Sequence, residues 1–202
     1  MITFSVPPGA TRKYVSAGTG AYAGGFAAVV TTEGAVAGTA IFSEFDGAGR
    51  LVGEAGVPAV AAVPNQAIFV DTQGGFNIGL AYANPGSASA DITLSLLDSA
   101  AASVATTAQT LGPGNHNAAF TFQIFPGAPP FVGTGTMQLR SSAPLAAIAL
   151  RFNPTFSLFT TLPPVTIASL ISPAVEWFER RPWLAPLTSV ARLLGAFHMR
   201  LA

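Results

Sequence analysis

The sequence predicts an all-β protein built on an immunoglobulin-like antiparallel β-sandwich. Between residues 67 and 165, apolar residues recur at every second position in one short segment after another, which is the side-chain period of a strand with one buried face. Each segment is bounded by Gly, Pro, Asn or Asp, the residues that form tight turns. About seven such strands with a turn every 8–12 residues are typical of an immunoglobulin-like sandwich, although a closed barrel fits the same alternation.

The first predicted strands lie between residues 67 and 98. "AIFVD" (67–71) leads into the turn "TQGG", and "FNIGLAYANP" and "ADITLSLLD" follow as two alternating segments. The apolar positions share one face of each strand. In the segment "ADITLSLLD" the hydroxyl side chains share the opposite face. The expected inward positions are Ile78, Leu80 and Tyr82, then Ile92, Leu94 and Leu96, with Thr93 and Ser95 outward.

The later strands follow the turn at Asp98. "ASVATTAQTL" (102–111) comes first, then "HNAAFTFQ", "GTMQLRSS" and "LAAIALRFNP", and "SLFTTLPP" is an edge piece closed by prolines, which cannot donate to a ladder. The expected inward positions are Ala118, Phe120 and Phe122, then Met137 and Leu139, then Ala146, Ile148, Leu150 and Phe152. The expected outward positions are Thr136, Gln138, Arg140 and Arg151.

Composition excludes several classes of protein. The 202 residues carry 9% charged side chains and a formal net charge of zero, so no basic footprint for nucleic acid is present. Cysteine is absent, which removes disulfides, thiolate nucleophiles and cysteine-bound zinc. No apolar run approaches the roughly 20 residues of a membrane-spanning helix. No signal peptide is encoded either, so we expect any export signal to lie upstream of Met1.

Two stretches repeat along the chain. "VPPGAT" (6–11) aligns with "LGPGNH" (111–116), and residues 25–42 align without gaps with residues 135–152. We therefore expect residues 1–63 to be the C-terminal half of one sandwich module and residues 64–168 to be a complete second module. The half module would contain strands over 2–6, 11–17, 25–32 and 35–42.

A half module leaves strand edges and an apolar face that something must cover. The complete module could extend its sheets over these strands, the C-terminal tail could dock on them, or a second chain could donate strands. We expect one of the first two in an isolated chain, and self-association through open strand edges if neither suffices.

Residues 169–202 differ in composition and predict a helical tail. Ser172 can cap a helix with Pro173 at its first position. A second helix would begin near Pro186 and place apolar side chains on one stripe. That stripe consists of Leu187, Val190, Leu194, Phe197 and Leu201. Such a stripe usually docks on a core or a partner.

Three segments carry a resemblance to known proteins: "AIFSEFDGAGRLVGEAGVPA", the stretch from "NIGLAYANPGSASADITLSLLD" to "GPGNHNAAF", and "GTMQLRSSAPLAAIALRFNPTFSLFTTLP". Residues 1–168 resemble the tandem immunoglobulin-like or fibronectin-type-III-like repeats of exported bacterial proteins. The resemblance implies an extracellular or cell-surface spacer, stalk or adhesion module, without catalytic residues.

The inventory of chemically active side chains is poor. His116 lies in the turn "GPGNHN" without a nucleophile motif nearby, His198 lies in the tail, and no zinc-binding histidine spacing is present. Glu44 and Asp46 lie two residues apart and are expected to form a solvated strand face. We therefore expect no enzyme and no required cofactor, but a noncatalytic structural or adhesive module.

The sequence offers one candidate metal site. Calcium takes oxygen ligands from Asp, Asn and backbone carbonyls, and Asp71, Asn77 and Asn84 flank two loops that could share one end of the sandwich. The alternative is turn chemistry, because Asp46, Asn84 and Asp98 all suit side-chain-capped turns without metal.

A ligand-binding module is the alternative function. The loop "FPGAPPF" could expose an apolar patch through Phe125, Pro129 and Phe131 and bind a glycan or a protein. The competing interpretation is a loop that folds over the end of the core as a plug.

Overall fold

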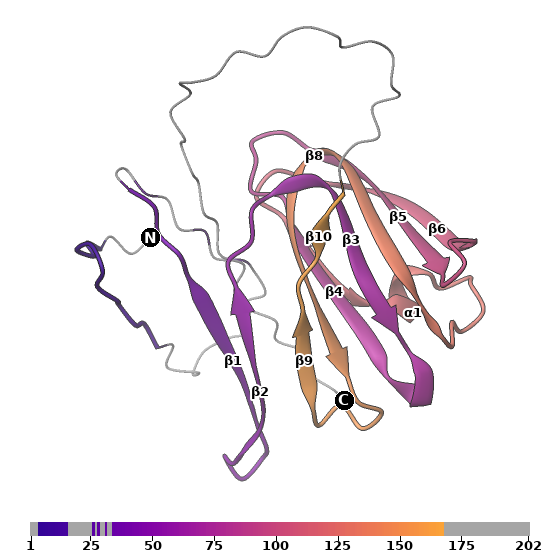
Figure 1. Cartoon of the computed structure of the whole chain (residues 1–202), viewed down its shortest axis with the longest axis horizontal. Coiled ribbons are helices and arrows are strands. Elements are labelled where there is room, and N and C mark those ends of the chain that lie inside the picture. The colour runs from indigo at the N-terminus through magenta and orange to yellow at the C-terminus, as the bar shows by residue number, and fades with distance from the viewer. Residues whose placement is uncertain (1–3, 16–25, 27, 29–30, 32–33, 168–202) are drawn as a thin grey trace, which may run out of the picture.

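The computed structural model describes residues 4–15, 26, 28, 31 and 34–167, and over these it is an all-β antiparallel sandwich (Figure 1). The strands are β1 Thr39–Phe45, β2 Leu51–Pro58, β3 Val63–Asp71, β4 Asn77–Ala83, β5 Ala90–Asp98, β6 Ser103–Leu111, β7 His116–Phe120, β8 Thr134–Phe152, β9 Phe159–Leu162 and β10 Val165–Thr166. A 3-10 turn, η1 Gln73–Gly75, and one helical turn, α1 Thr121–Ile124, complete the described elements.

The sandwich consists of two antiparallel layers. The first sheet has the order β6-β5-β8-β3-β10, and the second has the order β7-β4-β8-β9. At the edge of the first sheet β10 pairs with β3, and the N–H of Ile167 continues this ladder to the carbonyl of Asn65. The chain therefore enters this sheet at Val63 and leaves it beside Asn65, at the same end.

Strand β8 belongs to both sheets. Its residues 134–141 pair with β3 and β5, whereas residues 146–152 pair with β4 and β9. The change of partner surrounds Pro144, and the register with β3 is irregular there. A strand that changes sheets forms a closed corner. On the opposite side of the described sandwich β6 and β7 do not pair with each other. The two sheets therefore form an open sandwich and not the closed barrel that the sequence also allowed.

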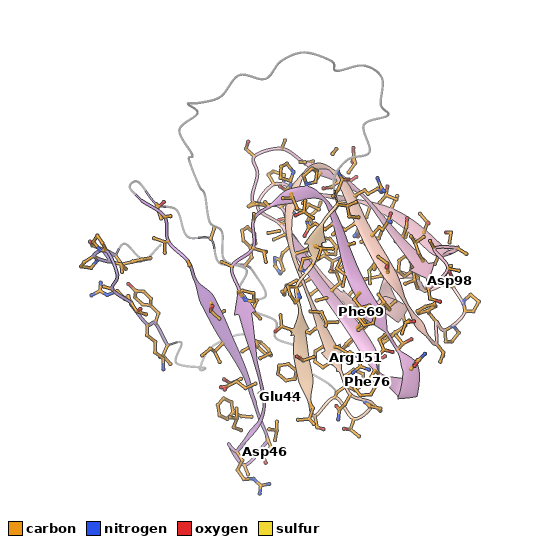
Figure 2. The ribbon with its side chains drawn as sticks, viewed as in Figure 1. Glu44, Asp46, Phe69, Phe76, Asp98 and Arg151 are labelled. Carbon is orange, nitrogen blue, oxygen red and sulfur yellow. The ribbon has the colours of Figure 1, made fainter. Side chains whose placement is uncertain are left out.

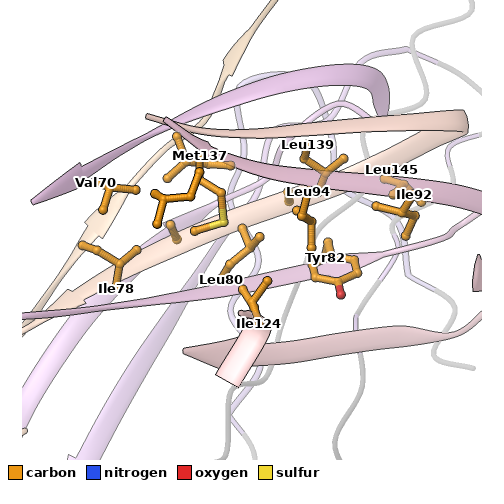
Figure 3. Close-up of a cluster of buried hydrophobic side chains, with 14 of the residues drawn as sticks. Val70, Ile78, Leu80, Tyr82, Ile92, Leu94, Ile124, Met137, Leu139 and Leu145 are labelled. Carbon is orange, nitrogen blue, oxygen red and sulfur yellow. The ribbon is translucent and has the colours of Figure 1, made fainter. Parts of the chain in front are cut away.

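The core between the sheets confirms most of the predicted alternation (Figure 3). The side chains that alternate inward on β3, β4, β5 and β8 are almost completely buried. They are Ile68, Val70, Ile78, Leu80, Tyr82, Ile92, Leu94, Leu96, Met137 and Leu139. The outward positions predicted for β5 and for the first half of β8 are confirmed by the same burial pattern.

The predicted facing of the second half of β8 is wrong. Leu145, Ala147 and Ala149 face the sandwich core, whereas Leu150 and Phe152 lie on the other face with Phe120 of β7. Both faces are buried, so this segment has no polar face to reveal which side points inward. Ala146 and Ile148 share the face of Leu150 by strand alternation.

The β1–β2 hairpin covers this second apolar face. Ala55 is buried against Phe120, Leu150 and Phe152, and the rings of Phe42 and Phe159 meet at 5.8 Å, edge to face. Farther along the face, Ala83 and Ala146 are covered by Phe26, Val60 and Ala62. The hairpin, together with Phe26, Val60 and Ala62, thus forms a third layer over the second sheet rather than extending it.

Several other predicted boundaries are corrected. Residues 4–6 and 11–15 are not strands, and β1 begins at Thr39 rather than at residue 35. The strand β2 was not predicted. The strand containing His116 ends at Phe120, where the backbone N–H meets the Gln123 side chain and α1 begins, so Phe122 is exposed. Most of the predicted strand over 25–32 and the whole tail 169–202 lie outside the described residues.

The two aligned turns have the same geometry. The N–H of Ala10 donates to Pro7 and that of Asn115 to Gly112, and the glycines between them have φ of 76° and 70°. A Pro-Gly pair favours this turn in any context. The division into a half module and a complete module therefore stays a prediction.

A second pair of turns is stabilised by aspartate. Asp46 accepts the N–H groups of the second and fourth residues after it, Ala48 and Arg50, and Asp98 does the same with Ala100 and Ala102. The third residue after each aspartate adopts a positive φ, which is 77° at Gly49 and 62° at Ala101. The interpretation of Asp46 and Asp98 as turn residues is confirmed.

Gln66 of β3 stabilises the corner at which β8 changes sheets. Its side chain is 2% exposed, and its Nε2 donates to the carbonyls of Leu145 and Val63 at 2.8 and 3.2 Å. These carbonyls lie where the register between β3 and β8 is irregular. A side-chain donor there replaces regular ladder bonds.

We predict that Gln66→Leu lowers the free energy of unfolding by about 2 kcal/mol, because two buried carbonyls lose a donor. Urea unfolding measures the change. Gln138→Leu, on the outer face of the same sheet, is the matched control and is expected to stay within about 0.5 kcal/mol. Equal effects of the two substitutions would contradict the role assigned to Gln66.

We also predict opposite effects of substitution in the two aspartate turns. Ala101→Gly is expected to raise the free energy of unfolding by about 0.5 kcal/mol, since glycine removes the left-handed strain of an L-residue at some cost in unfolded-state entropy. Gly49→Ala is expected to lower it by about 1 kcal/mol, although a new Cβ there meets nothing within 4 Å. Two changes of the same sign in thermal or chemical unfolding would refute the backbone explanation.

Candidate functional site

The outer face of the first sheet is an ordered surface built from five strands. Outward side chains of neighbouring strands lie in register and form rows across the sheet. These rows are Ala108-Thr93-Arg140-Asn65, then Thr106-Ser95-Gln138-Ala67-Val165, then Leu97-Thr136-Phe69. Because the positions are fixed by backbone pairing, this surface is rigid in outline. We call it the first-sheet face.

The chemistry of the first-sheet face is polar but neutral. Its centre consists of hydroxyl and amide side chains, accompanied by Arg140 and Asp91, while Asp71 at the end of β3 is paired with Arg151. Both Arg140 and Asp91 are exposed. The face therefore offers both hydrogen-bond donors and hydrogen-bond acceptors and carries no net charge.

Neighbouring side chains of this face hydrogen-bond to one another. Thr106 donates to Ser95 at 3.3 Å, Thr110 donates to Asp91 at 2.9 Å, and the Arg140 guanidinium donates to the Gln138 carbonyl oxygen at 3.3 Å. These bonds restrict the rotamers before any partner arrives.

One border of the first-sheet face is apolar. Phe69 points outward from β3 and is 55% exposed, and Val165 of β10 is 63% exposed (Figure 2). An exposed ring beside hydroxyl and amide groups can stack against an apolar surface of a partner. The sequence signal was present, because inward Ile68 and Val70 require outward Phe69, but the neighbouring strands could not be read from it.

The loop predicted as an apolar ligand platform is mostly a plug. Phe125 is 6% exposed inside the main core, and Ala128 and Phe131 pack against the same core from the loop. Pro129 is exposed. The expectation of an exposed Phe125 is wrong, because its ring supplies buried area that closes one end of the sandwich.

Asp71 lies at an end of the sandwich but is engaged by the protein itself. Its Oδ2 accepts a charge-assisted bond from Arg151 Nη2 at 2.7 Å, and the Arg151 guanidinium lies 3.5 Å from the centre of the Phe76 ring. Figure 2 shows Arg151 and Phe76 together at this end. Arg151 thus links the second sheet to β3 of the first, and it is half-buried rather than pointing freely outward as predicted.

The three residues predicted to hold calcium do not converge. Asn77 and Asn84 lie at opposite ends of β4, on the order of 20 Å apart at the rise of an extended strand. Asn84 is fully buried, and its amide donates to Ala88 and Leu111 while its oxygen accepts from Gly86. The shared site is therefore corrected to turn chemistry at Asn84. Among the described residues no group of three or more His, Cys, Asp or Glu is placed to hold a metal.

The other ionisable candidates are exposed or hold turns. His116 is exposed at the start of β7, and His198 lies outside the described residues. Asp46 binds Arg50 at 2.9 Å, and the hydrogen bond from the Arg50 backbone is the main cause that lowers the pKa of Asp46. Glu44 lies on β1, and Figure 2 shows both acids on the hairpin, away from the first-sheet face.

Tyr82 closes the open side of the sandwich. Its ring is 1% exposed, and its hydroxyl accepts hydrogen bonds from Gln109 of β6 and Asn117 of β7. The edge strands β6 and β7, which do not pair with each other, are thus connected through the Tyr82 hydroxyl. Burial raises the pKa of Tyr82 above its ordinary value of 10.0.

Comparison with known proteins adds no assignment. No protein-family model, no curated protein and no solved structure matches the chain. Within the described residues no helix is long and apolar enough to span a membrane. The resemblance to exported repeats stays a prediction.

We predict that stability falls above about pH 10 and that Tyr82→Phe removes part of this fall. The folded state holds the phenol proton more tightly than the unfolded state, so stability is full below the unfolded pKa and is lost as pH rises through the folded pKa. At neutral pH the substitution should lower the free energy of unfolding by about 1–2 kcal/mol.

Denaturant unfolding at a series of pH values measures both effects. Tyr14→Phe, which removes the hydroxyl of a side chain that is 52% exposed, is the matched control. An identical alkaline limb in wild type and Tyr82→Phe would exclude Tyr82 as its source.

Proposed function

We propose that this chain is a noncatalytic structural or adhesive β-sandwich module of a secreted or cell-surface bacterial protein. The first-sheet face is the surface that makes the contact. Export is supported by the resemblance of residues 1–168 to repeats of exported bacterial proteins.

The observation that carries the adhesive role is the neutral, hydroxyl-rich chemistry of the first-sheet face. Thr93, Ser95, Thr136 and Gln138 lie in register on adjacent strands. These four side chains are uncharged, so they do not form a cluster of charges of the kind that binds a cofactor. A partner with matching chemistry is a neutral polymer that offers many hydroxyl groups, such as a polysaccharide. Phe69, at the border, supplies a ring for stacking on the apolar face of a sugar.

We propose the first-sheet face as the binding surface in place of the loop "FPGAPPF". The loop buries Phe125, whereas the first-sheet face exposes Thr93 and Phe69 on rigid strands. Such a surface suits adhesion through many weak contacts. Repeated copies of the module would increase the retention of the protein on a polymer without requiring a deep pocket.

We predict that the protein is retained on the neutral polymers cellulose and chitin, and less on acidic alginate. The double variant Thr93→Glu, Thr136→Glu is expected to reduce retention on the neutral polymers about tenfold, because two carboxylates must then be desolvated at the contact. Co-sedimentation with the insoluble polymers measures the bound fraction.

The control adds the same charge elsewhere. Ser87→Glu, Ser89→Glu changes exposed residues of the loop between β4 and β5 and should leave retention unchanged. If the two double variants behaved alike, or if wild type bound neither neutral polymer, the adhesive role of the first-sheet face would be refuted.

A further inference from the structure

The edge strand β6 is the longest open edge of the described sandwich, and β10 leaves β3 open over residues 68–71. It pairs with β5 on one side, and no described residue pairs with the other side. Along an antiparallel strand alternate residues direct their N–H and C=O groups away from the partner. β6 therefore presents a row of backbone donors and acceptors along nine residues.

The other described edges carry features that discourage pairing. β10 has two residues and follows two prolines, β9 has four residues and ends just before Pro163, and β7 has five residues and is followed by α1. The β1–β2 hairpin contains Glu44 and Glu54 and ends at Pro58. Short length, proline and charge are the usual means by which proteins block edge-to-edge association.

β6 has none of these features. Its sequence "SVATTAQTL" contains no charge and no proline, and β-branched residues favour the extended conformation. Pairing with β5 is regular from Ala105 to Leu111, after a register shift near Leu96. The regular part is long enough to accept another strand.

The regular part is also complementary to itself. If two copies pair antiparallel about Ala108, this small residue faces its own copy on the exposed side, and Thr106 faces Thr110 of the other copy on both sides of it. Cross-strand Thr–Thr pairs are favourable. On the inner side Thr107 would face Gln109, and Ala105 would face Leu111.

We propose that β6 is a homodimer interface, in which two copies of this chain pair their β6 strands antiparallel about Ala108. The two first sheets become one continuous sheet through a two-fold axis, so the same strand serves both partners. The absence of charge on β6 favours an uncharged partner strand, and a second copy supplies one. The interface lies at the edge of the first-sheet face, to which Thr106 and Ala108 belong, whereas Thr93 and Thr136, the residues changed to test adhesion, lie on β5 and β8.

The test is a charge exchange at the facing threonines of the full chain. Thr106→Lys, Thr110→Lys places like charges opposite each other twice, and the dissociation constant of the dimer is expected to rise at least about tenfold. Thr106→Glu, Thr110→Lys keeps the second substitution and makes both facing pairs attractive. It is expected to restore the dimer, in a form weakened by salt.

Size-exclusion chromatography with light scattering over a concentration series measures the dimer. Hydrogen exchange should also show slower exchange of β6 amides in wild type than in the variant with two lysines. Thermal unfolding confirms that the variants fold, as expected for substitutions at exposed threonines.

Each result decides the matter. A dimer that the lysine pair weakens and the glutamate–lysine pair restores supports the proposed register. A monomer at all concentrations, a dimer that neither variant changes, or equal weakening by both variants would overturn it.

Discussion

β8 makes backbone hydrogen bonds in both sheets, and the position of every other strand of the sandwich follows from it. β3, β4, β5 and β9 pair with β8 directly. β6, β7 and β10 are each one strand farther away. The corner near Pro144 therefore sets the distance and angle between the layers, and Gln66 supplies donors where the ladder is interrupted. Loops also join the two sheets, from β3 to β4, from β4 to β5, from β6 to β7 and from β9 to β10, but only β8 passes from one sheet to the other within a single described strand.

Burial on both faces of β8 explains the third layer. The second half of β8 is too apolar to face water, and Phe120 and Phe152 add aromatic surface on its outer side. The β1–β2 hairpin contributes Ala55 and the small residue Gly53, whose missing side chain leaves room for the Phe159 ring. The hairpin thus stabilises the sandwich by covering a sheet face. Its backbone ladder is separate from those of the sandwich, and the Thr161 hydroxyl of β9 donates to the Gly56 carbonyl of β2 at 2.6 Å.

The sequence predicted strands and their facing well at β5 and in the first half of β8, where one face meets water. Thr93 and Ser95 alternate with Ile92 and Leu94, so both the strand and its facing followed from the pattern. The prediction missed β2, and it placed Ala118 of β7 inward although this residue is exposed. The prediction failed at Ala146 to Phe152, where both faces are apolar and period two carries no direction. It failed also at Thr121, where one helical turn interrupts an alternating segment.

For the candidate surface, outward Thr136 and Gln138 were predictable from the sequence. Their placement beside Thr93, Ser95 and Phe69 was not, because strand order depends on contacts between distant segments. Asn84 could be recognised as a turn residue, but its separation from Asn77 required the length and direction of β4.

The antiparallel pairing of β3 with β10 has a mechanical consequence. Because the chain enters at Val63 and leaves at Ile167 on the same end of one sheet, tension applied between these points loads the short ladder one bond at a time. Such a ladder peels at low force, whereas strands that leave at opposite ends resist in shear with all bonds together. In a stretched chain this sandwich would lie to one side of the line of force until β10 detaches from β3. The chain would then lengthen as β9 and β8 detach in turn.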